Sequence, residues 1–104
     1  MLKAALLVNA MAAGVLIAAV ANAADPVVGQ KTYEATCIAC HGAKGVSAVS
    51  IYPNLNGQKE EYLIGQLKAY RDGSRQNVIM QPMAKNLSDI DIANIAAYLS
   101  KLKS

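Results

Sequence analysis

The chain has 104 residues, of which 54% are hydrophobic and 5% aromatic, and its formal net charge is +3. So small a charge, without any segment dense in Lys and Arg, argues against a nucleic-acid-binding protein. The length allows one domain. A domain this short without Phe or Trp buries little apolar surface, so we expect a metal, a disulfide or a cofactor to stabilise it.

The N-terminal segment has the pattern of an export signal. Lys3 precedes an apolar run over residues 4–21, and Ala21-Asn22-Ala23 is a small-residue cleavage motif. We therefore expect residues 1–23 to be a signal peptide that is cleaved after Ala23, residues 24–104 to form the mature domain, and the protein to reside in the periplasm. The alternative is a retained membrane anchor, because the apolar run is nearly long enough to span a bilayer.

The mature segment opens with a predicted helix over residues 26–39. Asp25 is a good N-cap, and Pro26 suits the first helical position. Gly29 and Tyr33 lie four residues apart, so they share one packing face of this helix.

A second helix is predicted over residues 59–72. Leu63, Leu67 and Tyr70 recur at the spacing of one helical face. Two glutamates in the first turn and an arginine in the last turn complement the helix dipole. Gly73 is placed to end the helix.

A third helix is predicted after Ser88. Ser88 and Asp91 form an S-x-x-D pattern close to a capping box. The stripe that follows has helical spacing and consists of Ile92, Ile95, Leu99 and Leu102. Lys101 and Lys103 are expected to finish the helix at its negative end.

The segments between these helices, residues 41–58 and 73–87, are expected to be loops. The first is rich in Gly, Ser, Pro and Asn, and the second has no clear period. No strand-like alternation is sustained along the mature segment, so the predicted fold class is all-α.

Both cysteines and the single histidine fall within five residues, as Cys37, Cys40 and His41. A disulfide between the two cysteines would close too small a loop to add much stability. Zinc needs about four ligands, whereas this segment offers three, and a thioredoxin-like pair belongs near a βαβ pattern that the sequence lacks. Covalent haem attachment uses all three residues, because the thiols bond to the two vinyl groups and the histidine binds the iron as proximal ligand. We therefore expect one haem c as cofactor.

The second axial ligand is expected among the methionines, because one histidine cannot supply two imidazoles. Met80 and Met83 are the two methionines outside the expected signal peptide, and a thioether opposite a histidine is an established haem ligand. Spacing alone does not separate the two, and Pro82 stiffens the backbone beside both.

The segments around these residues resemble the class I c-type cytochromes, above all the short bacterial single-haem proteins and the halves of bacterial dihaem ones. The resemblance covers the whole mature segment and implies a cytochrome c fold, with about three main helices and loops wrapped around one covalently bound haem. The stretches that carry it are Cys37-Ile38-Ala39-Cys40-His41-Gly42, Tyr52-Pro53-Asn54-Leu55-Asn56-Gly57-Gln58, residues 62–73, Met80-Gln81-Pro82-Met83-Ala84 and Leu87-Ser88-Asp89.

The resemblance also implies roles for single residues. Met80 takes the position of the family's distal iron ligand, which leaves Met83 as a packing residue. Pro53 stands where the family's proline offers its backbone carbonyl to the proximal imidazole. The residues that match the family's crossing of the first and last helices are Gly29, Tyr33, Ile95 and Tyr98.

These features favour an electron carrier over an enzyme, because two strong ligands leave the iron no open position. The expected partners are redox proteins, a donor and an acceptor such as a membrane-bound oxidase or dehydrogenase, with neither nucleic acid nor a small-molecule substrate. Lys44, Arg75 and Lys85 are candidates to steer an acidic partner. The alternatives are a haem enzyme or gas sensor with a labile sixth ligand, a thiol oxidoreductase without haem, and a dedicated cytochrome subunit of a membrane redox complex.

Overall fold

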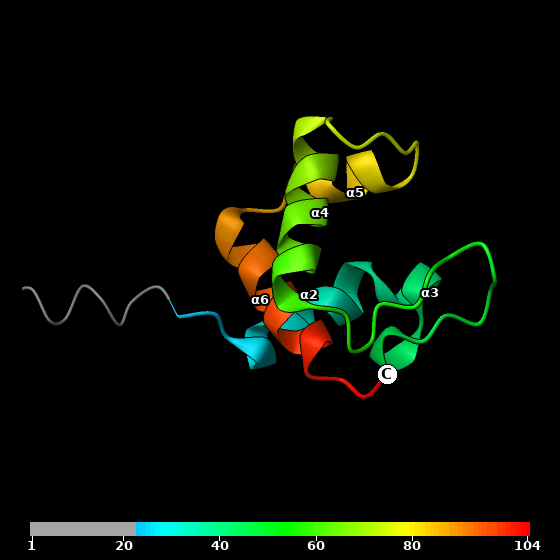
Figure 1. The fold of residues 1–104 in the computed structure, drawn as a ribbon, viewed down its shortest axis with the longest axis vertical. Coiled ribbons are helices and arrows are strands. Elements are labelled where there is room, and N and C mark those ends of the chain that lie inside the picture. Colours follow the sequence, from blue (N-terminus) through cyan, green and yellow to red (C-terminus); the bar gives the residue numbers. More distant parts are fainter. Residues whose placement is uncertain (1–22) are drawn as a thin grey trace, which may run out of the picture.

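The computed structural model describes residues 23–104, so all but the last residue of the expected signal peptide lies outside the described residues. Within this range the chain forms helices and no strand (Figure 1), which confirms the all-α class. None of these helices is long and apolar enough to cross a bilayer. The elements are α2 (Pro26–Thr36), α3 (Ile38–His41), the 3-10 turn η1 (Ala43–Gly45), α4 (Glu60–Asp72), α5 (Met80–Lys85) and α6 (Asp89–Ser100).

The first helix is shorter than the sequence predicts. Asp25 caps it as expected, since its Oδ1 accepts hydrogen bonds from the backbone N–H groups two and three residues on, at 2.9 and 3.3 Å. The helix ends at Thr36 rather than at residue 39, and Cys37 (φ −108°) separates it from α3. The Thr36 hydroxyl donates to the carbonyl of Thr32 at 3.0 Å. Back-bonding of this kind often bends helices, and here it coincides with the last residue of α2.

Helices α2 and α6 cross at close range beside Gly29. A Cβ built on Gly29 would lie 1.9 Å from the carbonyl oxygen of Asn94, so the approach requires glycine. One turn along α2, the rings of Tyr33 and Tyr98 pack with their centroids 5.7 Å apart. The side chain of Asn94 also accepts a hydrogen bond from the backbone N–H of Asp25 at 2.7 Å. The start of α2 is thereby fixed on α6.

The core lies where α2, α4 and α6 meet. Its buried members are Tyr33, Leu63, Ile95, Ala96, Tyr98 and Leu99. Packed against them are apolar side chains that are only partly buried, namely Cys37, Ile38, Leu55, Ile64, Leu67, Leu87 and Leu102. The polypeptide alone thus leaves much of its apolar surface half covered, in line with a domain that needs a cofactor.

The ends of α4 and α6 follow local sequence signals. Gly73 ends α4 in the left-handed conformation (φ 88°). Ser88 and Asp91 form the predicted capping box, in which each backbone N–H donates to the other side chain at 3.0 Å. Lys101 is the C-cap of α6, so Lys103, which we expected to finish the helix, lies beyond its end.

The prediction of a continuous loop over residues 73–87 is wrong, because its second half forms α5, which packs against α4. The Oδ1 of Asn77 accepts hydrogen bonds from the N–H groups of Ile79 and Met80, both at 2.9 Å. Asn77 lies two residues before Ile79, the N-cap of α5, and a turn closed by an Asn side chain can lead into a helix without apolar periodicity. The hydrophobic pattern therefore did not reveal this helix. Met80 is thereby the first residue of a short helix.

Candidate functional site

The two thiols lie on one turn of backbone at the edge of the core. The N–H groups of Cys40 and His41 both donate to the carbonyl of Cys37, at 3.3 and 3.0 Å, so the cysteines are three residues apart on a helical turn. Both thiols are free and partly buried. Burial raises the pKa of the Cys37 thiol, against the lowering effect of a hydrogen bond with the Thr36 hydroxyl.

His41, the last residue of α3, is 7% exposed and is oriented by a backbone carbonyl. Its Nδ1 lies 2.9 Å from the carbonyl oxygen of Pro53. Because a carbonyl can only accept, Nδ1 is the donor and carries the ring proton. In the neutral tautomer with this proton, Nε2 has a free lone pair, the form in which imidazole binds a metal.

The loop between α3 and α4 folds back so that Pro53 reaches His41. Gly42 has a φ of 82°, and a Cβ there would lie 1.8 Å from a backbone carbonyl oxygen, so this bend requires glycine. The carbonyl of Gly45 accepts hydrogen bonds from the N–H groups of Leu55 and the residue after it, at 2.8 and 3.2 Å. These bonds draw the two ends of the loop together.

Tyr33 connects the core to this loop. Its hydroxyl donates to the carbonyl of Gly42 at 2.7 Å, and its side chain is fully buried. Burial raises the pKa of Tyr33 to about 12. The phenol is therefore a neutral donor at physiological pH. Sequence reasoning assigned Tyr33 to helix packing alone and missed its contact with the residue after His41, because no local pattern reports a bond between segments nine residues apart.

The two methionines differ in burial. Met80 is partly buried, whereas Met83 is 44% exposed. Both lie in α5, which is on the same side of α4 as α3 (Figure 1). The helix that carries the candidate thioethers and the turn that carries the thiols and the imidazole thus belong to the same side of the molecule.

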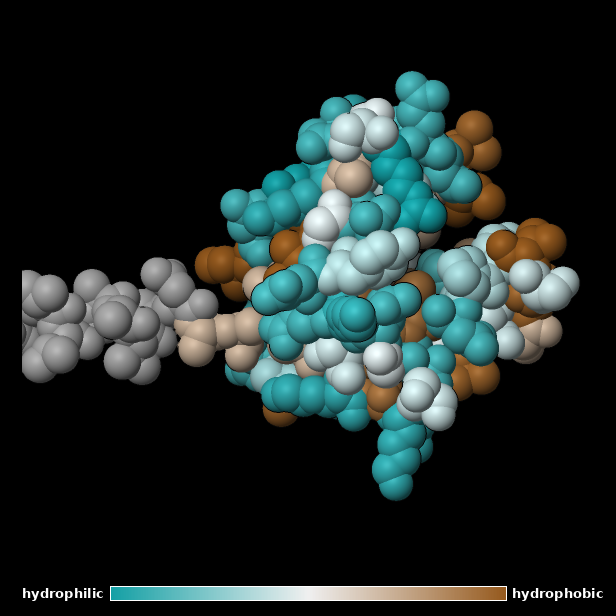
Figure 2. Space-filling view, in the orientation of Figure 1, coloured by the Kyte–Doolittle hydropathy of each residue, from teal (hydrophilic) through white to brown (hydrophobic). Residues whose placement is uncertain are grey.

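Apolar side chains are exposed on the loops next to both helices. Figure 2 shows hydrophobic atoms gathered at this side, over the loop after α3 and the loop before α5. The exposed apolar side chains of these two loops are Val46, Val49, Ile51, Val78 and Ile79, and Met83 in α5 is exposed as well. Apolar side chains exposed together indicate a surface that contacts an apolar partner. Two thiols, an oriented imidazole, a thioether and these apolar loops together fit a haem.

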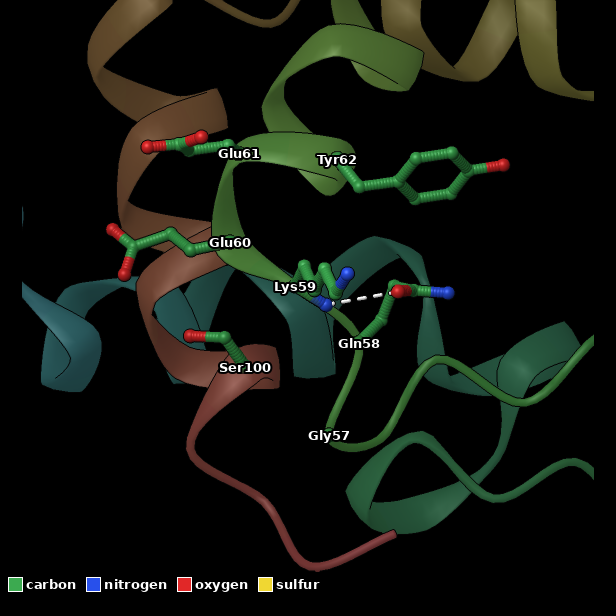
Figure 3. Close-up of a pocket in the computed structure, with 7 residues that line it drawn as sticks. All are labelled: Gly57, Gln58, Lys59, Glu60, Glu61, Tyr62 and Ser100. Carbon is green, nitrogen blue, oxygen red and sulfur yellow. Dashed lines mark hydrogen bonds between the residues drawn. The ribbon is translucent and has the colours of Figure 1, made fainter.

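Two surface hollows lie away from the thiols and the imidazole. The one in Figure 3, about 710 Å³ in volume, lies at the start of α4 and is lined mainly by the polar side chains of Gln58, Lys59, Glu60 and Glu61. A smaller one of about 420 Å³ lies between α5 and the end of α4. Neither is lined by a cysteine, a histidine or a methionine, so neither takes part in the candidate site.

Comparison with known proteins decides the family. The family model of cytochrome c matches residues 27–103. The chain belongs to the cytochrome c family. This cytochrome is 56% identical over 68 residues to cytochrome c-554(548) of Halomonas halodenitrificans, and the match covers 62% of the chain and 82% of that relative. It is 49% identical over 70 residues to the thiosulfate dehydrogenase electron acceptor of Thiomonas intermedia, with 66% of the chain and 32% of the relative covered.

The fold matches as well. The structure of cytochrome c4 from Acidithiobacillus ferrooxidans superimposes with a TM-score of 0.69 at 29% sequence identity, over 79% of this chain and 53% of that one. The cytochrome therefore spans most of one relative, a third of another and about half of the structural neighbour. The expected cytochrome c fold is confirmed, and with it a covalently bound haem c and a role in electron transfer.

Proposed function

We propose that this cytochrome is a periplasmic single-haem electron carrier whose iron is bound by His41 and Met80 and whose ring is attached through Cys37 and Cys40. The haem supplies the redox chemistry, because its iron cycles between Fe(II) and Fe(III). The polypeptide attaches the ring, orients its ligands and shields it from water. The observation that carries the proposal is the contact between His41 Nδ1 and the Pro53 carbonyl.

That contact supports the role of His41 as proximal ligand. A hydrogen bond from Nδ1–H fixes the orientation of the imidazole and raises the basicity of Nε2, as partners of metal-bound histidines commonly do. The acceptor belongs to the backbone of a loop that Gly42 and Gly45 hold in place. The imidazole is thus set in position by the fold and not by a mobile side chain.

Met80 is the better candidate for the distal ligand, because it is partly buried whereas Met83 is exposed. A thioether stabilises Fe(II) relative to Fe(III) and so raises the reduction potential. If His41 and Met80 both bound the iron, no coordination position would remain for a substrate, which supports a carrier and not an enzyme.

The proposed partners are redox proteins that dock over the exposed apolar loops. Lys44 and Lys85, both exposed, lie on η1 and at the end of α5, so they are placed to steer an acidic partner toward this side. One relative is named an electron acceptor of thiosulfate dehydrogenase, which supports a dehydrogenase as one class of donor. A membrane-bound oxidase is a corresponding acceptor.

We also propose that the N-terminal segment directs export and is then cleaved. Residues 1–23 would be removed as a signal peptide and residues 24–104 would form the haem domain. The motif Ala21-Asn22-Ala23 supports this cleavage. Mass spectrometry of the exported protein tests the cleavage after Ala23.

Carbon monoxide binding to the reduced protein tests the ligation. The wild type should bind CO slowly at neutral pH, Met80→Ala should bind it rapidly, and Met83→Ala should behave as the wild type. Rapid uptake by the wild type would instead favour a gas sensor or haem enzyme with a labile sixth ligand. Loss of the haem spectrum after denaturation and extraction would contradict covalent attachment.

A further inference from the structure

Two side chains close the turn that precedes Met80. The Oδ1 of Asn77 accepts hydrogen bonds from the N–H groups of Ile79 and Met80, both at 2.9 Å. Gln81 reaches back, and its Oε1 accepts from the N–H of Asn77 at 2.8 Å. The N–H of Gln81 in turn donates to the carbonyl of Asn77 at 3.1 Å. Met80 thus lies inside a reciprocal set of hydrogen bonds related to the capping box.

Packing contributes little to this turn. Val78 is 89% exposed and Ile79 is 44% exposed, and Asn77 is exposed as well. The buried side chain of α5 is Ala84, one turn after Met80. The backbone of Met80 is therefore anchored by packing on one side only. On the other side its position depends on the hydrogen bond that its N–H donates to Asn77, whose own N–H donates to Gln81.

We propose that Asn77 and Gln81 are positioning residues that keep the Met80 thioether at the distal face of the haem, an inference that rests on the proposed His41–Met80 ligation. If the turn opens, the backbone torsions before Met80 become free and its side chain samples positions away from the iron. The closed turn removes that freedom, because residues behind a ligand hold it in its binding geometry. Asn77 and Gln81 thereby determine how often the Met80 thioether dissociates from the iron.

Binding of CO to the reduced holoprotein measures this opening, because CO enters only while Met80 is dissociated. Asn77→Ala removes the acceptor of two N–H groups and should raise the rate of CO binding about fivefold, which corresponds to about 1 kcal/mol, the usual worth of such a cap. Asn77→Ser restores a capping oxygen and should return the rate to within about twofold of the wild type. Gln81→Leu should raise the rate, and Gln81→Glu, which keeps an acceptor, should not.

Two control variants separate positioning from a general loss of stability. Asn86→Ala changes the asparagine at the other end of α5, whose side chain makes no hydrogen bond within the described residues. Asp25→Ala removes the cap of α2 and should destabilise the fold without touching the turn before Met80. Both should bind CO at the wild-type rate, and thermal melting should show that Asp25→Ala is at least as destabilised as Asn77→Ala.

The rate of CO binding to Met80→Ala is the reference for a haem whose distal position carries no thioether. Fast CO binding in Met80→Ala together with an unchanged rate in Asn77→Ala overturns the positioning role and leaves the ligation intact. An unchanged rate in Met80→Ala overturns the ligation, and the inference with it. A rate in Asp25→Ala that rises as much as in Asn77→Ala also overturns the inference, because global stability would then explain both. The double variant of Asn77→Ala and Met80→Ala should bind CO no faster than Met80→Ala alone.

Discussion

The backbone carbonyl of Asn94 occupies the space that a side chain at Gly29 would need. A Cβ on Gly29 would lie 1.9 Å from the oxygen and 2.3 Å from the carbon of that carbonyl. The obstacle is helix backbone, which cannot rotate away as the end of a side chain can. The same crossing carries the contact between Tyr33 and Tyr98, so the packing of α2 on α6 depends on the missing side chain.

Gly29→Ala should therefore destabilise the holoprotein, by about 1–3 kcal/mol as is usual for overpacking. The gain in helix propensity from Gly to Ala, about 1 kcal/mol, is too small to offset the displacement of two helices. Denaturant unfolding followed by circular dichroism measures the change.

Gly65→Ala is the matched control for this substitution. Gly65 lies inside α4 and is exposed, and a Cβ at this position would meet no atom within 4 Å. The same change there should stabilise the protein by about 0.5–1 kcal/mol. If Gly29→Ala were as stable as Gly65→Ala, the close crossing of α2 and α6 would be refuted.

Tyr33 should give the stability of the domain a dependence on alkaline pH. Burial raises its pKa to about 12 in the folded protein, against about 10 in the unfolded chain. Because the unfolded phenol loses its proton first, the contribution of Tyr33 is complete below pH 10 and is lost as the pH rises from 10 to 12. The full loss amounts to about 3 kcal/mol.

Denaturation midpoints of the wild type and Tyr33→Phe between pH 7 and 12 test this dependence. At neutral pH the variant should be less stable by about 1 kcal/mol, since it lacks the hydrogen bond to Gly42. The difference between the two proteins should shrink above pH 10 and change sign before pH 12, because the wild type loses more stability there than the variant lacks at neutral pH. Tyr62→Phe, at an exposed tyrosine, should show no such change, and a constant difference for Tyr33→Phe would contradict the burial argument.

Arg71 should control the titration of Asp89. Its guanidinium donates to the Leu87 carbonyl at 3.0 Å and to the Asp89 carboxylate at 2.6 Å. The hydrogen bond, together with the charge of Arg71, lowers the pKa of Asp89. A lowered pKa in the folded state contributes stability above the ordinary Asp pKa of about 3.9, which is lost as the pH falls through the folded value.

Arg71→Gln should therefore raise the pKa of Asp89 toward its ordinary value in a carboxyl titration followed by NMR. The effect on stability at neutral pH should be small, because the pair is exposed. Asp72 is the internal control, since its pKa is lowered mainly by the backbone and side chain of Ser74. An equal shift of Asp72 and Asp89 would show that Arg71 acts through general charge alone.

The parts of the fold that the sequence predicts correctly are those specified by neighbouring residues. The cap at Asp25 and the capping box of Ser88 and Asp91 each involve groups within three residues of one another, so the pattern contains the whole interaction. Helix α5 was missed because the turn before it is closed by side-chain bonds of Asn77 to the backbone. Such bonds leave no trace in hydrophobic periodicity.

The candidate site divides in the same way. Cys37, Cys40 and His41 fall within five residues, so the sequence alone predicts haem attachment there. The bond from His41 to Pro53 spans twelve residues, and only resemblance to a family could suggest it. Spacing alone did not separate Met80 from Met83, because what distinguishes them is burial, which depends on how α5 packs against α4.

Loss of the haem should unfold the domain. Partly buried apolar side chains, among them Cys37, Ile38 and Leu55, border the candidate site. Without the haem their apolar surface faces water, at a cost of about 25 cal/mol per Å². A variant with Cys37→Ala and Cys40→Ala should therefore lose most of its helical circular dichroism and melt without a cooperative transition. Wild-type polypeptide made without haem attachment is the control, because it keeps both thiols and should behave like the variant. Full helicity with a sharp melt in either protein would show that the core of α2, α4 and α6 suffices, and that the haem serves electron transfer without supporting the fold.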